Sequence, residues 1–146
     1  MEKEKITIQN YQEHAMRTCL PSAKNWSYAV FGLDAEYYEL SAKMTGFKAK
    51  QIRDGDDFDE AKYLEKIKDE VGDNFWFIAL KCELREIQFA EIFDSGKFGH
   101  DEEFVRWLLQ VCEYFHFDIN EILQRNIDKL ASRKERGVLK GNGDER

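Results

Sequence analysis

The stretch Lys68–Leu84, KDEVGDNFWFIALKCEL, decides the fold of this chain. It lacks proline, and its apolar residues recur at the three- and four-residue steps of a helix. Phe77 and Leu80 lie on one predicted face, and Phe75 and Ile78 lie on the opposite face. A helix that is apolar nearly all round is buried on both sides. The stretch therefore predicts a helix that the rest of the chain covers from two directions.

Helical patterning continues through most of the remaining sequence. The chain has one proline, Pro21, and nine glycines, which argues against a turn-rich sandwich or barrel. Gly46 is placed to end the second predicted helix as a C-cap. Asp118 and Glu121 have the spacing of a capping box. The predicted helices are Ile6–Cys19, Ala23–Thr45, Phe58–Phe89, Asp101–Phe115 and Asp118–Arg133, with connectors over Phe47–Asp57 and Ala90–His100.

Length and patterning together predict one all-α domain. A chain of 146 residues fits a single domain, here residues 1–136, with one sizeable core. Residues 137–146 have no periodicity and are predicted to form a flexible tail. The expected architecture is a bundle of about five helices.

Composition argues against several function classes. The net charge of −7 repels a nucleic-acid duplex, and no basic run compensates for it except in the last predicted helix. No apolar run reaches the roughly 18 residues that a membrane span needs, and the N-terminal MEKEKITIQ is not that of a signal peptide. The three cysteines are widely spaced and odd in number, which is typical of reduced core thiols in a cytoplasmic protein.

Two acidic pairs stand out because of their surroundings. Glu70 and Asp73 lie on a stripe of the Lys68–Leu84 helix that continues into apolar residues, and Glu36 and Glu39 lie on a half-apolar face of the second predicted helix. An ionised carboxylate on such a face costs several kcal/mol unless it is paired or metal-bound. On the same helix, Gly32 costs about 1 kcal/mol relative to alanine, which the close approach of a ligand or a neighbouring helix would explain.

The two pairs could converge across the interior of the bundle. Four carboxylates brought together repel one another, and each raises the pKa of its neighbours. Hard divalent cations remove this repulsion, and an oxygen-only ligand set suits Mg²⁺ or Mn²⁺ better than Zn²⁺. The alternative is that all four acids are partly exposed flank positions, neutralised by Lys43, Lys66 and Lys81.

The last predicted helix carries polar groups of another kind. Asn126 lies near the centre of the apolar stripe, where an amide without hydrogen bonds is costly. Lys129 and Arg133 follow one and two turns later and could reach phosphate oxygens. The alternative is an amide satisfied by the backbone and two solvated cations that favour the helix C-terminus.

Three motifs occur in order along the chain: Glu36-x-x-Glu39 in GLDAEYYEL, Glu70-x-x-Asp73 in KDEVGDNFWFIAL, and Asn126-x-x-Lys129-Leu130-x-x-Arg133 in NIDKLASRKERG. Together they resemble the MazG-like all-α nucleoside triphosphate pyrophosphohydrolases. The resemblance implies a Mg²⁺-dependent enzyme that splits a (d)NTP into the monophosphate and pyrophosphate. It also implies a helical bundle that assembles as a homodimer or homotetramer.

The resemblance further implies roles for particular residues. The metal ligands would be Glu36, Glu39, Glu70 and Asp73, and the phosphate or nucleotide contacts would be Asn126, Lys129 and Arg133. Either Glu36 or Glu39 is expected to orient or deprotonate the water that attacks the α-phosphorus. A base pocket needs aromatic or amide groups, and the candidates are His14, Asn25 and Trp26.

Two other function classes remain open at this point. One is a non-enzymatic helical interaction module, in which Phe77, Trp107 and their neighbours form a partner or dimer surface. The other keeps the metal site but takes a different substrate, such as another phosphorylated metabolite or an alarmone. Mg²⁺-dependent release of pyrophosphate from a panel of dNTPs separates these classes.

Overall fold

The structure is a computed structural model that describes residues 4–95 and 101–137. These residues form helices and connecting turns without any strand, which confirms the predicted all-α fold. The α-helices are α1 (Tyr11–Arg17), α2 (Trp26–Asp54), α3 (Glu60–Arg85), α4 (Glu91–Ser95), α5 (Glu102–Tyr114) and α6 (Ile119–Glu135). Two short 3₁₀ turns, η1 (Pro21–Ala23) and η2 (Gly55–Asp57), precede and follow α2.

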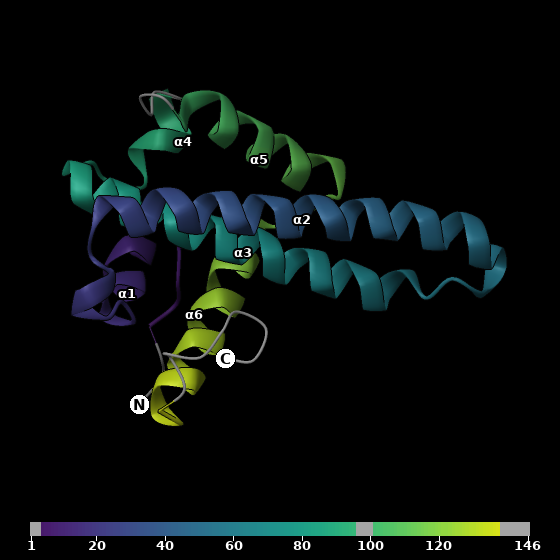
Figure 1. Ribbon diagram of the computed structural model, residues 1–146, viewed down its shortest axis with the longest axis horizontal. Helices are drawn as coiled ribbons and strands as arrows, with labels where there is room; N and C mark the ends of the chain where they lie inside the picture. Colours follow the sequence, from purple (N-terminus) through teal and green to yellow (C-terminus); the bar gives the residue numbers. More distant parts are fainter. Residues whose placement is uncertain (1–3, 96–100, 138–146) are drawn as a thin grey trace.

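The two longest helices, α2 and α3, run side by side and antiparallel along the long axis of the molecule (Figure 1). The turn at η2 joins them at one end. Helices α4 and α5 lie on one side of this pair, whereas α1 and α6 lie on the other (Figure 1). Helix α3 is therefore covered from both directions, as the Lys68–Leu84 stretch predicts.

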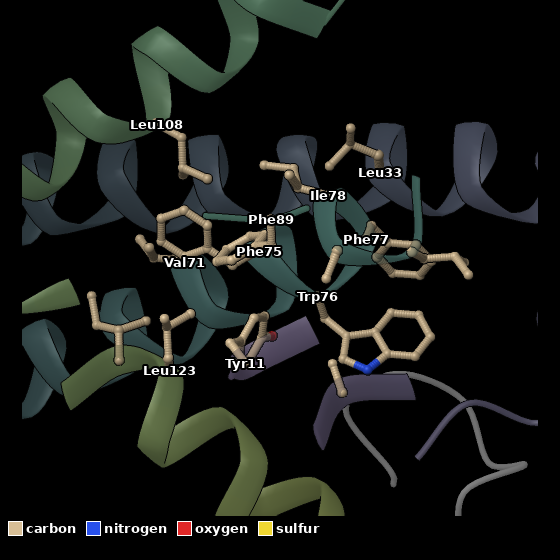
Figure 2. Packing of buried hydrophobic residues seen from close by; sticks show 14 of the residues in the cluster. Tyr11, Leu33, Val71, Phe75, Trp76, Phe77, Ile78, Phe89, Leu108 and Leu123 are labelled. Atoms are coloured by element: carbon tan, nitrogen blue, oxygen red, sulfur yellow. The ribbon is translucent and has the colours of Figure 1, made fainter. Parts of the chain in front are cut away.

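The core is centred on α3. Val71, Phe75 and Ile78 have no exposed surface. Figure 2 shows Val71 between Leu108 of α5 and Leu123 of α6. All residues of α3 from Asn74 to Cys82 are buried, including both predicted apolar faces. Burial of this stretch on every side is what holds the remaining helices around α3.

Gly46 does not end α2, so the predicted helix boundary is wrong. The helix continues to Asp54, and Gly55 ends it with a φ of 56°. The reason is Phe47, which is buried and packs its ring 5.1 Å from that of Phe58 and 5.7 Å from that of Phe115. Burying a phenylalanine contributes about 1.5–3 kcal/mol, which exceeds the cost of about 1 kcal/mol for a glycine within a helix.

Gly32 lies where a neighbouring helix approaches closely, which is one of the two explanations that the sequence suggests for it. A Cβ atom at this position would collide with the ring of Phe77, at its Cε1 and Cζ atoms. The absence of a side chain therefore lets α3 approach α2 closely, just before the first acidic motif. Phe77 itself is buried, so it does not belong to a partner surface as the alternative of an interaction module expected.

Several predicted boundaries shift by a few residues. The first helix is shorter than Ile6–Cys19, and the predicted connector Ala90–His100 contains α4. Asp118 caps α6 as predicted, but its carboxylate accepts from the N–H of Asn120 at 3.0 Å. Glu121 binds Lys68 at 3.1 Å instead of completing a capping box. Apart from Gly137, the predicted tail over 137–146 lies outside the described residues.

Two further predictions concern the state of the cysteines and the lack of a membrane-spanning helix. Cys19, Cys82 and Cys112 are all buried free thiols, as predicted. Burial raises the pKa of Cys82 and of Cys112 to about 12. Among the described residues, no helix combines the length and the apolar character needed to cross a bilayer.

Candidate metal and phosphate site

The antiparallel pairing of α2 and α3 brings the two acidic motifs together. Asn74, which is fully buried, fixes the register between the two helices at this level. Its side-chain amide donates to the backbone carbonyl of Glu36 on α2 at 3.1 Å and to that of Glu70 on its own helix at 2.8 Å. The amide therefore ties the two helices together at the backbone positions that carry the carboxylates.

Three carboxylates converge at this point. Glu36, Glu70 and Asp73 each offer an oxygen, and these oxygens lie within 4.8 Å of one another. Glu36 is 8% exposed and Glu70 is 3% exposed, so the alternative of partly exposed flank positions is wrong for these two acids. Glu39 is half-buried and lies outside this group of three, but its negative charge acts on Glu36.

The electrostatics of the cluster disfavour three negative charges. Burial, together with the charges of Asp73, Glu39 and Glu70, raises the pKa of Glu36 to about 9. Burial also raises the pKa of Glu70, although Lys43 opposes this shift. Burial raises the pKa of Asp73 as well, against the effect of Lys129. The site therefore has more carboxylate charge than its own lysines neutralise.

Two oxygen atoms in the cluster lack hydrogen-bond partners in the described part of the chain, which also indicates a cation site. Oε2 of Glu36 and Oε2 of Glu70 are buried and have no hydrogen-bond partner among the described residues. A buried acceptor without a partner costs about 1–3 kcal/mol, and more when it is charged. A divalent cation would satisfy both oxygens, and an all-oxygen donor set is the one that Mg²⁺ and Mn²⁺ prefer. The residues present therefore fit such an ion.

Positive side chains lie against the same carboxylates. Lys43 of α2 binds Glu70 at 2.5 Å, and Lys129 of α6 binds Asp73 at 2.6 Å. Arg133 lies one turn beyond Lys129, where its charge opposes the rise in the pKa of Asp73. Lys43, Lys129 and Arg133 also line a cavity of about 140 Å³ together with Lys66, Asp69, Glu70 and Asp73. Acidic and basic groups thus meet across one polar opening.

Three lysines were expected to neutralise the four acids of the two motifs. Of these three, only Lys43 forms an ion pair with one of the acids, Glu70, within the described residues. Lys81 instead binds Asp101 at 2.9 Å, so its predicted role is wrong. Lys66 lines the polar cavity, and its Nζ atom lies 5.2 Å from the ring centre of Tyr63.

Asn126 reaches the acidic cluster through a buried hydrogen-bond chain. The hydroxyl of Tyr11 donates to Oδ1 of Asn126 at 2.7 Å, and Nδ2 of Asn126 donates to Asp73 at 3.4 Å. The Tyr11 bond fixes the orientation of the amide, so the NH₂ group faces the carboxylate. Sequence reasoning missed Tyr11, because it lies 115 residues from Asn126 and on no acidic motif.

A second, more apolar pocket adjoins the carboxylates. Tyr28, Trp76 and Phe77 line it together with Glu36, Asp73 and Arg133. The rings of Tyr28 and Phe77 are 5.4 Å apart. This pocket places flat aromatic surfaces next to the polar opening.

The three predicted base-pocket residues are not among the residues that line this pocket. Asn25 caps α2 by accepting from the N–H of Tyr28 at 2.8 Å. Trp26 packs under the guanidinium of Arg85, which lies 4.7 Å from the ring centre. His14 binds Glu4 at 3.0 Å. The aromatic residues beside the cluster are instead Tyr28, Trp76 and Phe77.

The chain is similar in sequence to a bacteriophage protein. The Gene 37 protein of Mycobacterium phage L5 is 30% identical over 125 residues, which cover 86% of this chain and 80% of the phage protein. The chain therefore belongs to the same family as that phage protein. No family model matches the chain, and no solved structure matches it.

Proposed function

We propose that this protein is a Mg²⁺-dependent nucleoside triphosphate pyrophosphohydrolase of the MazG-like all-α class. It would hydrolyse a (d)NTP to the monophosphate and pyrophosphate by attack of water at the α-phosphorus. The observation that carries the proposal is the convergence of Glu36, Glu70 and Asp73, with two buried carboxylate oxygens left without partners.

The order of the three motifs along the chain supports this proposal in addition to the geometry of the carboxylate cluster. A carboxylate cluster alone would serve many metal-binding proteins. Here a lysine and an arginine follow on α6, and Lys129 contacts the cluster directly. Phosphoryl transfer depends on neutralising charge and positioning the nucleophile, so carboxylates that hold cations beside basic side chains are the groups it needs.

Each group of the site then has a role in the reaction. Bound Mg²⁺ supplies Lewis acidity, which polarises phosphate oxygens and makes a neighbouring water more acidic. Glu36, Glu70 and Asp73 would hold the cation, with Glu39 completing the set. Substrate binding would draw Lys129 from Asp73 to the phosphate oxygens. Arg133 lies one turn further and would bind the departing pyrophosphate.

The proton of the attacking water needs an acceptor. Glu36 or Glu39 would take it at a carboxylate oxygen, because Glu36 belongs to the carboxylate cluster and the charge of Glu39 acts on it. The nucleobase would lie in the adjoining pocket, against the rings of Tyr28 and Trp76. We propose a cytoplasmic location, which the three buried free thiols support.

The test measures pyrophosphate and monophosphate released from dATP, dGTP, dCTP, dTTP, dUTP and oxidised dNTPs, with and without Mg²⁺. Glu70→Gln removes one ligand charge and is expected to abolish Mg²⁺-dependent turnover while the helical circular dichroism spectrum stays unchanged. Glu113→Gln, which changes an exposed carboxylate on α5, is the matched control and should keep wild-type turnover. Full activity in Glu70→Gln would refute the proposal.

The same assay separates the other function classes. Turnover of a phosphorylated metabolite or an alarmone, with no (d)NTP hydrolysed, would keep the metal site and change the substrate. Release of orthophosphate instead of pyrophosphate would place the attack on a different phosphorus atom. Binding of a protein partner with no hydrolysis of any member of a widened panel would favour an interaction module.

A further inference from the structure

Lys43 forms an ion pair with the acidic cluster although it belongs to none of the three motifs. It lies on α2, one turn after Glu39 and two turns after Glu36, and residues at this spacing share a face of a helix. Its Nζ atom lies 2.5 Å from Oε1 of Glu70 on α3. The side chain of Glu70 is 4% exposed, whereas that of Lys43 is 35% exposed. The lysine therefore reaches a buried carboxylate from the open side of the site.

The ammonium group of Lys43 supplies part of the positive charge that the acidic cluster needs. Burial raises the pKa of Glu70, and the hydrogen bond and charge of Lys43 oppose this rise. Lys129 binds Asp73 in a similar way, at 2.6 Å. Two ammonium groups carry the same total charge as one divalent cation. In the cation-free protein, the two lysines are therefore internal counter-ions of the carboxylates.

A divalent cation and Lys43 have opposing claims on Glu70. Oε1 of Glu70 accepts from Lys43, and Oε2 is buried with no hydrogen-bond partner among the described residues. A cation that takes Oε2 would share one carboxylate group with the ammonium on Oε1. Two positive charges this close repel each other, and the burial of Glu70 limits the water that could screen them. Cation binding therefore weakens the hold of Glu70 on Lys43.

We propose that Lys43 is an exchangeable counter-ion: it holds Glu70 in the cation-free protein, and cation binding releases its ammonium group to bind a phosphate group. The inference rests on the proposed function, because it concerns the same carboxylates. The released group has an anion site at hand, since Lys43 lines the polar cavity together with Lys129 and Arg133. Lysine suits such an exchange, because its flexible four-carbon stem carries donors that can reorient.

The exchange couples the binding of the cation to the binding of the phosphate. Without a cation, Glu70 holds the charge of Lys43, and the surrounding carboxylates repel a phosphate group. With a cation bound, the charge of Lys43 becomes available to the phosphate. Linkage requires the reverse effect as well, so a phosphate that binds Lys43 favours cation binding. This coupling adds to any direct contact between the cation and the phosphate.

The first test measures the binding of Mn²⁺ alone at pH 8, from the electron paramagnetic resonance signal of the free ion. Lys43→Met keeps an unbranched side chain and removes the competing charge, so it is expected to bind Mn²⁺ roughly tenfold more tightly than the wild-type chain. Lys43→Arg keeps the charge and should bind Mn²⁺ no more tightly than the wild-type chain. An affinity of Lys43→Met equal to or below that of the wild-type chain would overturn the proposal.

The matched control for this test is Lys48→Met, which removes the same charge from an exposed position of the same helix. The Nζ atom of Lys48 lies 5.5 Å from the ring centre of Tyr114, and Lys48 does not line the polar cavity. Lys48→Met should therefore bind Mn²⁺ as the wild-type chain does. A gain in affinity as large as that of Lys43→Met would mean that net charge alone is responsible, and it would overturn the exchange.

The second test measures the binding of inorganic pyrophosphate by titration calorimetry, in EDTA and in excess Mg²⁺. In Mg²⁺, Lys43→Met is expected to bind pyrophosphate roughly tenfold more weakly than the wild-type chain, because a charge-assisted hydrogen bond is lost. In EDTA, where Glu70 holds Lys43, both chains should bind it equally weakly. The same loss in both conditions, or no loss in Mg²⁺, would overturn the release of Lys43.

The exchange and the proposed function fail in different ways. If neither the wild-type chain nor Lys43→Met binds Mn²⁺, the metal site is refuted and the exchange with it. If both chains bind Mn²⁺ with the same affinity, the metal site stands and only the exchange is refuted. Neither measurement uses turnover, so both can be read without any enzymatic activity.

Discussion

Replacing Glu36 with glutamine should make the cation-free protein more stable while removing a ligand from the proposed metal site. Glu36 is buried beside other carboxylates, and its pKa is raised from 4.5 to about 9. Between these two values the folded chain holds a proton that the unfolded chain has lost. The free energy of unfolding of the cation-free protein therefore falls as the pH rises from 4.5 toward 9.

The size of the effect follows from the width of this window. At pH 8, the unfolded glutamate is 3.5 pH units above its ordinary pKa of 4.5, and each unit corresponds to about 1.4 kcal/mol. The largest gain for Glu36→Gln at pH 8 is therefore about 5 kcal/mol. At pH 5 the same reasoning leaves a gain below about 1 kcal/mol. Glutamine keeps the shape of the protonated carboxyl group, so packing contributes little to the difference.

The assay is urea unfolding of both proteins at pH 5 and pH 8, in EDTA and then in Mn²⁺. In EDTA, Glu36→Gln should exceed the wild-type protein in stability by several kcal/mol at pH 8 and by little at pH 5. A ligand that binds only the folded state adds about 2.7 kcal/mol at a hundredfold excess over its Kd, and the variant should lose most of this gain. Equal stability of the two proteins at both pH values would refute the reasoning.

Two further predictions concern the close contacts around the site. Gly32→Ala should lower the free energy of unfolding by more than about 1 kcal/mol, because the new methyl group collides with the ring of Phe77. Urea unfolding measures this difference. A variant as stable as the wild-type protein would contradict the close approach of α3 to α2. Tyr11→Phe leaves Oδ1 of Asn126 buried without its donor, so stability should fall by about 1–3 kcal/mol. Because the amide then loses its fixed orientation, kcat for (d)NTP hydrolysis should fall more than KM rises, and unchanged kinetics would limit Tyr11 to a structural role.

The fold was largely predictable from one segment. The all-round apolar character of residues 71–84 requires burial on both sides, and burial requires helices on both sides. The end of α2 was not predictable by the same means. Gly46 is a strong local stop signal, but the burial of Phe47 against Phe58 and Phe115 outweighs it. Tertiary contacts of this kind join residues far apart in the sequence.

The two acidic motifs could be predicted from the sequence. Which of their carboxylates meet in the folded chain could not. Spacing alone indicates that Glu70 and Asp73 share a face of α3, and that Glu36 shares one with Glu39. The register between α2 and α3 depends on the amide of Asn74, whose two backbone acceptors no spacing reveals. This register explains why Glu36 joins the cluster of three while Glu39 stays at its edge.

Crystals grown or soaked in Mn²⁺ give the most direct measurement of whether the carboxylates hold a cation, because the anomalous scattering of manganese locates the ion without reference to activity. The account predicts an anomalous peak within about 2.5 Å of oxygens from Glu36, Glu70 and Asp73, with Oε2 of Glu36 and of Glu70 among them. A map with no peak among these residues, and with Lys43 and Lys129 still bound to Glu70 and Asp73, would contradict it.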